Sequence, residues 1–168
     1  GDRLAVVIDG RLRQIGRPED VFADPAGEEV AAFVGVDNII RGRVAHIGGG
    51  AATALVGDVP ISVVGDFAPG DELVVGIRPE AVILEEVSRD SVLTSALNRL
   101  PGEVTGILHM GALARVNVDC GIPLVSLVTG QSVENLSLSP GTAVLASFKA
   151  SAIQVIRHIP GDAAGLAR

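Results

Sequence analysis

The sequence predicts a mainly β fold, built as two small barrels in tandem. From residue 37 onward, short runs rich in Val, Ile and Leu are bounded by Gly or Pro. They recur at a spacing of roughly 8 to 12 residues, which is typical of a β-sandwich or a barrel. The order of the runs in the first half of this region recurs in the second half. Apolar residues make up 48% of the chain, enough to bury a core in each half.

Composition excludes several classes of protein. The formal net charge is −7, and the aromatic residues, 2% of the chain, are all Phe. Such a chain repels phosphate backbones and lacks stacking platforms for bases, so nucleic acid is not an expected partner. The single cysteine, Cys120, allows no internal disulfide, and the three histidines lack metal-ligand spacing, so we expect no metal site. Since no apolar run approaches the roughly 18 residues of a membrane span and no leader opens the chain, we expect a cytoplasmic protein.

Residues 1–36 differ from the rest of the chain. Asp9 and Gly10 lie between two short runs, which is a strong hairpin signal. Pro18, followed by two acidic residues, predicts the start of one helix, and a second is expected over residues 28–34. A hairpin and two short helices bury little surface alone, so we interpret this segment as the end of a larger domain.

The two halves of the remaining chain align in register. Asn38–Val44 matches Asn98–Val104 at an offset of 60, and Pro69–Val82 matches Pro140–Ile153 at an offset of 71. The second copy therefore carries an 11-residue insertion, which we place near residues 129–137, with Ser132 capping a single helical turn. The predicted organisation is a domain remnant, a first barrel, a linker, a second barrel and a tail, at 1–36, 37–86, 87–94, 95–158 and 159–168.

Several stretches resemble one known family. The segments 3–11 and 14–19 are similar to the end of the nucleotide-binding domain of an ABC importer ATPase. Gly-Ile-Arg-Pro-Glu, residues 76–80, resembles the signature of the TOBE regulatory barrel that follows that domain, and 94–102, 128–132 and 148–151 resemble the Mop oxyanion-binding barrel. The resemblance implies OB-like TOBE/Mop barrels, from the C-terminal regulatory region of a molybdate/tungstate-type ABC importer ATP-binding subunit.

The resemblance also implies a site for a tetrahedral oxyanion. Because the four oxygens of molybdate or tungstate only accept hydrogen bonds, the site must be built from donors. The implied ligands are three hydroxyl residues, the only lysine of the chain and one backbone N–H: Ser95, Thr129, Ser132, Lys149 and Ala150. In the family they meet where two subunits pack, so Thr129 and Ser132 are expected to act across a homodimer interface.

One position departs from the family pattern. Leu97 stands where the Mop motif carries Arg, which removes a cation from the implied site. Arg99, two residues further on an extended strand, shares its face and is a candidate substitute. Asn98 is a possible accessory residue, although its counterpart Asn38 occurs in the first repeat without a matching Ser, which favours a structural role.

Two functions from different classes stay open at this point. The first is an oxyanion sensor that regulates transport, and the second is a structural dimerisation module, as in sugar, polyamine or iron importers. In the second case, the hydroxyl residues are caps or turn residues and Lys149 is a surface cation. The insertion, which residues 38–84 lack, favours the sensor.

No phosphate-binding loop of the Gly-x-x-x-x-Gly-Lys-Ser/Thr type occurs in the sequence. We therefore expect no catalytic residue, no ATP hydrolysis and no cofactor in this chain, ATP and Mg belonging to the domain that the resemblance places before it. The expected partners are a second copy and, through the parent ATPase, transmembrane permease subunits, which would hold the protein at the cytoplasmic side of the inner membrane.

Overall fold

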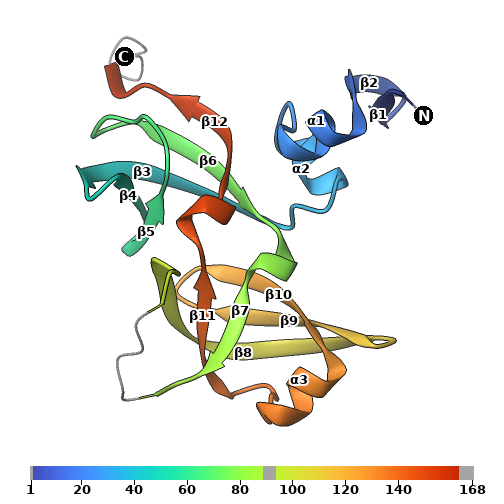
Figure 1. Ribbon diagram of the computed structural model, residues 1–168, viewed down its shortest axis with the longest axis vertical. Helices are drawn as coiled ribbons and strands as arrows, with labels where there is room; N and C mark the ends of the chain where they lie inside the picture. The colour runs from blue at the N-terminus through green and yellow to red at the C-terminus, as the bar shows by residue number, and fades with distance from the viewer. Residues whose placement is uncertain (1, 89–93, 163–168) are drawn as a thin grey trace.

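The computed structural model describes residues 2–88 and 94–162. The N-terminal segment folds as predicted into a hairpin and two helices (Figure 1): β1 (Leu4–Ile8), β2 (Arg11–Gly16), α1 (Pro18–Ala23) and α2 (Glu28–Phe33). Asp9 and Gly10 both have positive φ, as the tight hairpin turn requires. Three valines form a small core of their own here, Val6, Val21 and Val30.

Two curled five-stranded antiparallel sheets follow, and they confirm the predicted pair of OB-like barrels. The first four strands of the first repeat are β3 (Asn38–Gly48), β4 (Ala51–Val56), β5 (Val59–Val63) and β6 (Glu72–Ile77). Those of the second repeat are β8 (Asn98–Met110), β9 (Leu113–Asp119), β10 (Pro123–Thr129) and β11 (Ala143–Phe148). Both repeats carry a bulge at the same place, after Val44 in β3 and after Val104 in β8.

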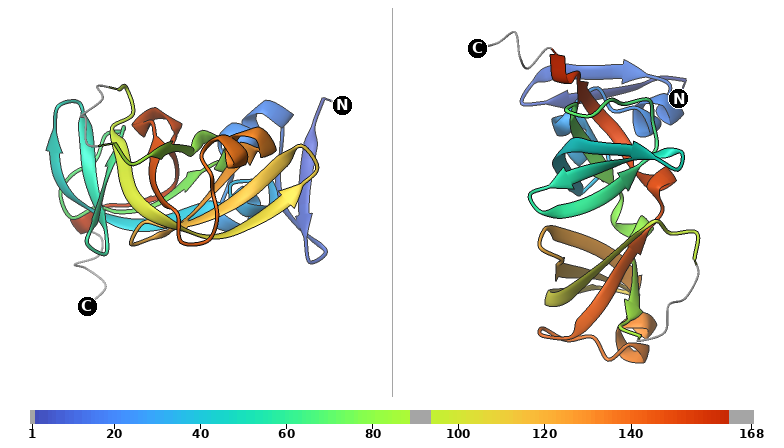
Figure 2. Two further views of the ribbon diagram at one scale, coloured as in Figure 1. Left: turned by 90° about the horizontal axis from the view of Figure 1, so that it is seen from below. Right: turned by 90° about the vertical axis from the view of Figure 1, so that its left-hand side faces the viewer.

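The last strand of each repeat joins the sheet of the other repeat. A short 3-10 turn, η1 (Pro79–Ala81), leads to β7 (Ile83–Glu86), which pairs with β11 in the second sheet. The equivalent turn, η2 (Ala150–Ala152), leads to β12 (Gln154–Ile159), which pairs with β6 in the first sheet. The sheet orders are thus β12-β6-β3-β4-β5 and β10-β9-β8-β11-β7, and the two sheets lie one above the other (Figure 2).

This exchange means that the sheets do not coincide with the sequence ranges 37–86 and 95–158 in their last strands. The sequence could not show it, because β7 and β12 occupy equivalent places in two similar repeats and either sheet offers the same open edge. Buried side chains of both repeats form one continuous core, which includes Val82 and Leu84 together with Val144 and Phe148 of the second sheet.

Two asparagines fasten the repeats to each other in a reciprocal way. The buried Asn38, at the start of β3, donates to Val125 O at 2.9 Å and accepts from Val125 N at 2.6 Å. Asn98, at the start of β8, makes the same pair of bonds to Ser62, at 2.9 and 2.8 Å. Each amide therefore satisfies the backbone of an edge strand in the opposite repeat, as pseudo-twofold symmetry requires.

The 11 extra residues of the second repeat are divided between two places. Aligned through the strand pairs, Ala51 corresponds to Arg115 and Ile61 to Leu124, so the offset of 60 has already become 64 and then 63 within the sheet. The β8–β9 hairpin is thus longer than the β3–β4 hairpin. The remaining residues follow β10 and include α3 (Gly130–Asn135), so the predicted position of the insertion is only partly correct.

Candidate functional site

One half of the predicted site lies at the end of β10. Thr129 is the N-cap of α3: its Oγ1 accepts from Ser132 N at 3.1 Å and lies 2.9 Å from Ser132 Oγ. The prediction that Ser132 is the cap was wrong, because α3 begins at Gly130 and Ser132 already lies inside it. Thr129 is exposed and Ser132 is half-buried, so the end of β10 presents two adjacent hydroxyl groups to solvent.

The other half lies at the end of β11. Lys149 follows β11 directly and is exposed, and the buried Ala150 opens η2. Ser95 is exposed three residues before β8 begins, and the first residue of β8, Asn98, pairs with Phe148. The three predicted ligands of this half therefore lie at the same end of two neighbouring strands, β8 and β11: Ser95, Lys149 and Ala150. Within the described part of the chain, the Lys149 side chain makes no hydrogen bond or ion pair, while its backbone carbonyl accepts from Ala152 N at 3.0 Å.

A single copy of the chain does not join these halves. The strand β8 begins at Asn98, beside the lysine half, and ends at Met110. Met110 pairs with Leu113 of β9, and Leu113 pairs with Thr129 of the hydroxyl half. The 12 residue steps between them correspond to roughly 40 Å of extended strand, less where the sheet curls. The hydroxyl half and the lysine half thus lie at opposite ends of the second barrel.

The three residues from Leu97 to Arg99 differ in their exposure and in their contacts. Leu97 is 60% exposed, whereas the Arg99 side chain lies against β7, its Nε 3.9 Å from Glu85 Oε2. Ser147, which pairs with Arg99 across the strands, donates its hydroxyl to the same carboxylate. The amide of Asn98 is occupied by Ser62, as described above. Glu85 therefore opposes the charge of the arginine that we considered as a substitute.

Sequence reasoning missed the role of Arg78, which is the counterpart of Lys149 in the first repeat. Its guanidinium donates to Val34 O and Phe22 O, both at 3.2 Å, and lies 5.9 Å from the centre of the Phe22 ring. Gln154 of β12 also donates to Phe22 O, at 3.5 Å. The cation that follows β6 thus holds the N-terminal segment, and its position in Gly-Ile-Arg-Pro-Glu is the signal that could have indicated it.

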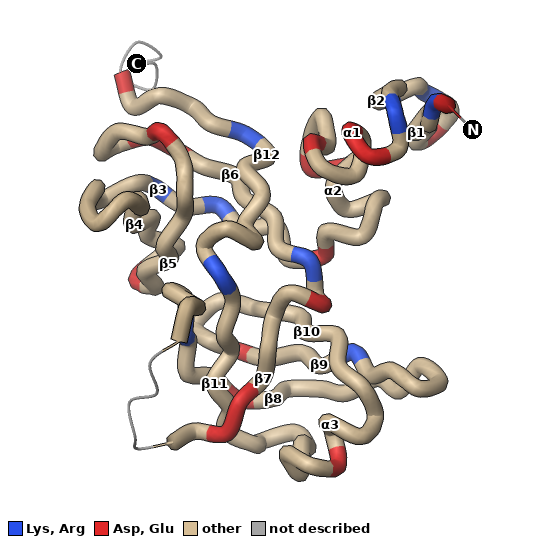
Figure 3. Tube along the Cα trace, viewed as in Figure 1, with Lys and Arg blue, Asp and Glu red and all other residues tan. Residues whose placement is uncertain are grey.

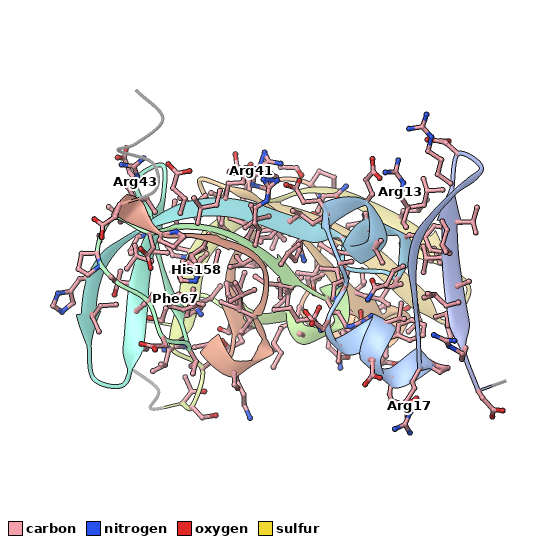
Figure 4. The ribbon with its side chains drawn as sticks, turned by 90° about the horizontal axis from the view of Figure 1, so that it is seen from above. Arg13, Arg17, Arg41, Arg43, Phe67 and His158 are labelled. Carbon is pink, nitrogen blue, oxygen red and sulfur yellow. The ribbon has the colours of Figure 1, made fainter. Side chains whose placement is uncertain are left out.

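A further polar cluster closes the first barrel beside β12. Asp71 is buried and accepts from Ala68 N and Gly161 N, each at 2.9 Å, and lies 2.6 Å from His158 Nε2. These backbone donors, and then His158, lower the pKa of Asp71 to about 2. The Phe67 ring meets His158 edge-on, with 5.2 Å between the centroids (Figure 4). The cluster anchors the end of the exchanged strand β12.

Other titratable groups do not gather into a site. Burial, and then the neighbouring Asp119, raises the pKa of the Cys120 thiol to about 11, so this thiol is not a reactive one. Among the described residues, no three His, Cys, Asp or Glu side chains lie close enough to hold a metal ion. Acidic and basic positions are scattered over the whole trace in Figure 3. No helix in residues 2–88 and 94–162 has the length and hydropathy that crossing a membrane requires.

Comparisons with known proteins define the class of protein. Residues 94–155, which hold both halves of the candidate site, match the model of the TOBE domain. The cytoplasmic molybdate-binding protein ModG, in a crystal form with molybdate bound, superposes with a TM-score of 0.62 at 27% identity, over 73% of this chain and 95% of that chain. The described barrels therefore have the TOBE/Mop architecture.

The particular resemblance is to one kind of transport subunit. The molybdate/tungstate import ATP-binding protein WtpC of Pyrococcus abyssi is 42% identical over 92% of this chain, and that of Pyrococcus horikoshii is 40% identical over 92%. The spermidine/putrescine import ATP-binding protein PotA of Nitrosomonas europaea is 28% identical over 93%. The predicted resemblance to an importer ATP-binding subunit of the molybdate/tungstate type is thus confirmed. The chain spans about two-fifths of the length of the WtpC relatives, 42% of each.

Proposed function

We propose that this chain is the oxyanion-sensing regulatory region of a molybdate or tungstate importer, preceded by the last part of its ATPase domain. The observation that carries the proposal is the pair of hydroxyls of Thr129 and Ser132, 2.9 Å apart, where β10 meets the helical insertion that the first repeat lacks. The identity to WtpC proteins supports the choice of anion class. The ModG comparison supports binding by barrels of this architecture.

The site is completed by a second copy of the chain in this proposal. The hydroxyl half and the lysine half lie at opposite ends of one barrel, so an oxyanion that needs both must bind between two molecules. Neutral hydroxyl donors and a charged amine then meet the acceptor oxygens, and hydrogen bonds to charged groups are worth about 1.5 to 3 kcal/mol each. Binding would tie two regulatory regions together and reduce transport when the anion is abundant.

The wider setting follows from the same proposal. The chain would act at the cytoplasmic side of the inner membrane, attached through its ATPase domain to permease subunits. It would hydrolyse no ATP by itself, since the residues needed for that belong to the domain before it. The purified chain, assayed for phosphate release against a buffer blank, should show no turnover.

Calorimetric titration tests the proposed function. Molybdate, tungstate and sulfate are titrated into the wild-type chain, Lys149→Ala and Arg157→Ala, while sedimentation at about 50 μM reports the oligomeric state. Arg157 is a matched control, because it is also an exposed cation, on β12 of the first sheet. We expect the wild-type chain and Arg157→Ala to bind equally as dimers and Lys149→Ala to bind more weakly. Equal affinities for all three would move the site elsewhere.

The alternative function is a dimerisation module without an anion, and the likeness to the polyamine-import protein PotA favours it. In that case Thr129 and Ser132 serve only to start α3. The same titration separates the two functions: a stable dimer that binds none of the three anions would establish the alternative.

A further inference from the structure

The outer face of the β9–β10 pair carries a cation that neither the family motif nor the sequence analysis identified. In the strand register, Arg115 lies directly opposite Leu127, and Leu113 lies opposite Thr129. Cross-strand partners, and residues two apart in a strand, share a face of the sheet. Arg115 and Thr129 are therefore diagonal neighbours on one face. Diagonal neighbours have a spacing of roughly 7 to 8 Å, which a long side chain can span.

Arg115 forms an ion pair with an acidic residue that directly precedes β3, the first strand of the first sheet. Its Nη1 forms a close ion pair with Asp37 Oδ2, and the two side chains are 37% and 30% exposed. Asp37 belongs to the short segment 34–38, which runs from the end of α2 to the first residue of β3. The ends of that segment are fixed, Val34 O by Arg78 and Asn38 by Val125. Val36, in the middle of this segment, is fully buried. Arg115–Asp37 is the polar contact between the last residue before β3 and the strand pair that ends at Thr129.

The surroundings leave room for the arginine to change partner. An open cavity of about 350 Å³ is lined by Arg115, Asp37, Leu127 and Gly35. Gly35 has a φ of +94°, a conformation that side-chain-bearing residues rarely adopt. A half-exposed ion pair beside such a cavity can be exchanged for another pair without unpacking a core.

The cation occurs only in the repeat that carries the hydroxyls. The first-repeat counterpart of Arg115 is Ala51, and no counterpart of α3 follows β5. Arg99 lies against Glu85, whereas Arg115 lies on the face and at the strand end where Thr129 presents its hydroxyl.

We propose that Arg115 is a further anion-binding residue, and that a tetrahedral oxyanion at Thr129 and Ser132 competes with Asp37 for its guanidinium. The inference rests on the proposed function and adds the regulation of the same site. Without anion, Arg115 holds Asp37 and hence segment 34–38; with anion, Arg115 turns to the oxyanion and Asp37 is released. Because coupling is reciprocal, Asp37 weakens anion binding by the factor by which the anion weakens the Arg115–Asp37 pair.

Four chains titrated with molybdate test the competition. Asp37→Asn removes the competing charge and keeps the shape, and it should tighten Kd about fivefold or more. Glu72→Gln is the matched control, because it removes an equivalent carboxylate from an ion pair with Arg43, on the first barrel. It should change Kd less than twofold. Arg115→Gln should weaken binding about tenfold, and adding Asp37→Asn to it should then give no gain.

Hydrogen exchange of the same chains reports the segment directly. Molybdate should speed exchange of the amides of residues 34–38 in the wild-type chain and leave them unchanged in Arg115→Gln. Thermal melts of each variant establish that it is folded, and Asp37→Asn carries the test if Arg115→Gln does not fold. If Lys149→Ala weakens binding but Asp37→Asn binds like the wild-type chain, the competition is refuted and the proposed function stands. If the wild-type chain and Asp37→Asn both fail to bind, both proposals are refuted.

Discussion

The two repeats of this chain share one framework but differ in what the cation after their fourth strand contacts. Both start with an asparagine that binds the opposite repeat, have a bulge at the same place in their first strand and carry a cation between the fourth strand and a 3-10 turn. In the first repeat that cation, Arg78, binds backbone carbonyls of the N-terminal segment. In the second repeat, Lys149 faces solvent. The cation after the fourth strand therefore contacts the N-terminal segment in the first repeat and is exposed to solvent in the second.

The largest expected difference between the repeats is in anion binding. Lys149→Ala should weaken molybdate or tungstate binding by roughly 2 to 4 kcal/mol, since it removes a charged donor. Arg78→Ala should leave Kd unchanged and instead loosen residues 22–34, as seen by limited proteolysis. Calorimetry on both variants makes the comparison. A loss of affinity in Arg78→Ala equal to that in Lys149→Ala would mean that the repeats are not specialised in this way.

The second prediction compares equivalent glycines in the two long strands. A Cβ on Gly102 would lie 2.6 Å from Cys120 Sγ and 2.7 Å from Asp119 O, whereas on Gly42 the nearest atom would be Leu55 O at 3.0 Å. Gly102→Ala should therefore lower the free energy of unfolding by about 3 kcal/mol and Gly42→Ala by about 1 kcal/mol. Urea denaturation of both variants measures the difference, and equal losses would contradict the packing described here.

The third prediction concerns the reciprocal asparagines. Removing either amide leaves a backbone N–H and C=O of an edge strand without their partners, which should cost about 2 kcal/mol for Asn38→Ala or Asn98→Ala. The two losses should be similar, because the bonds are equivalent. If only Asn98→Ala abolished anion binding while both were equally stable, Asn98 would be a ligand and not a structural residue.

The smallest effect is a dependence of stability on acid pH that comes from Asp71 of the first repeat. The pKa of Asp71 is lowered from 3.8 to about 2 in the folded chain. Its stabilising contribution is therefore complete above pH 3.8 and is lost as the pH falls toward 2. Thr142, its counterpart, accepts from Ser139 N at 3.0 Å and does not titrate. The stability gap between the wild-type chain and Asp71→Asn, measured by denaturation from about pH 5 downward, should shrink with acidity. A constant gap would argue against this assignment.

The sequence was sufficient for features that depend on local pattern and insufficient for those that depend on pairing. Alternating apolar runs, the Asp9-Gly10 turn and the internal repeat predicted the strands, the hairpin and two barrels. The exchange of β7 and β12 was not predicted, because strand pattern does not specify which edge a strand joins. Arg115 was missed for the same reason: its place beside Thr129 and Asp37 follows from cross-strand register and from a residue 78 positions earlier.

The exchanged strands also determine when each sheet can be completed during synthesis of the chain. The first sheet cannot be completed until β12 has been synthesised, and β12 begins 77 residues after β6 ends. Four strands of this sheet therefore emerge from the ribosome long before the fifth. At about 5 to 20 residues per second this interval lasts several seconds, during which the β6 edge is open. Neither barrel can be excised at its sequence boundaries without leaving an unpaired edge, so each barrel depends on the other repeat for its complete sheet.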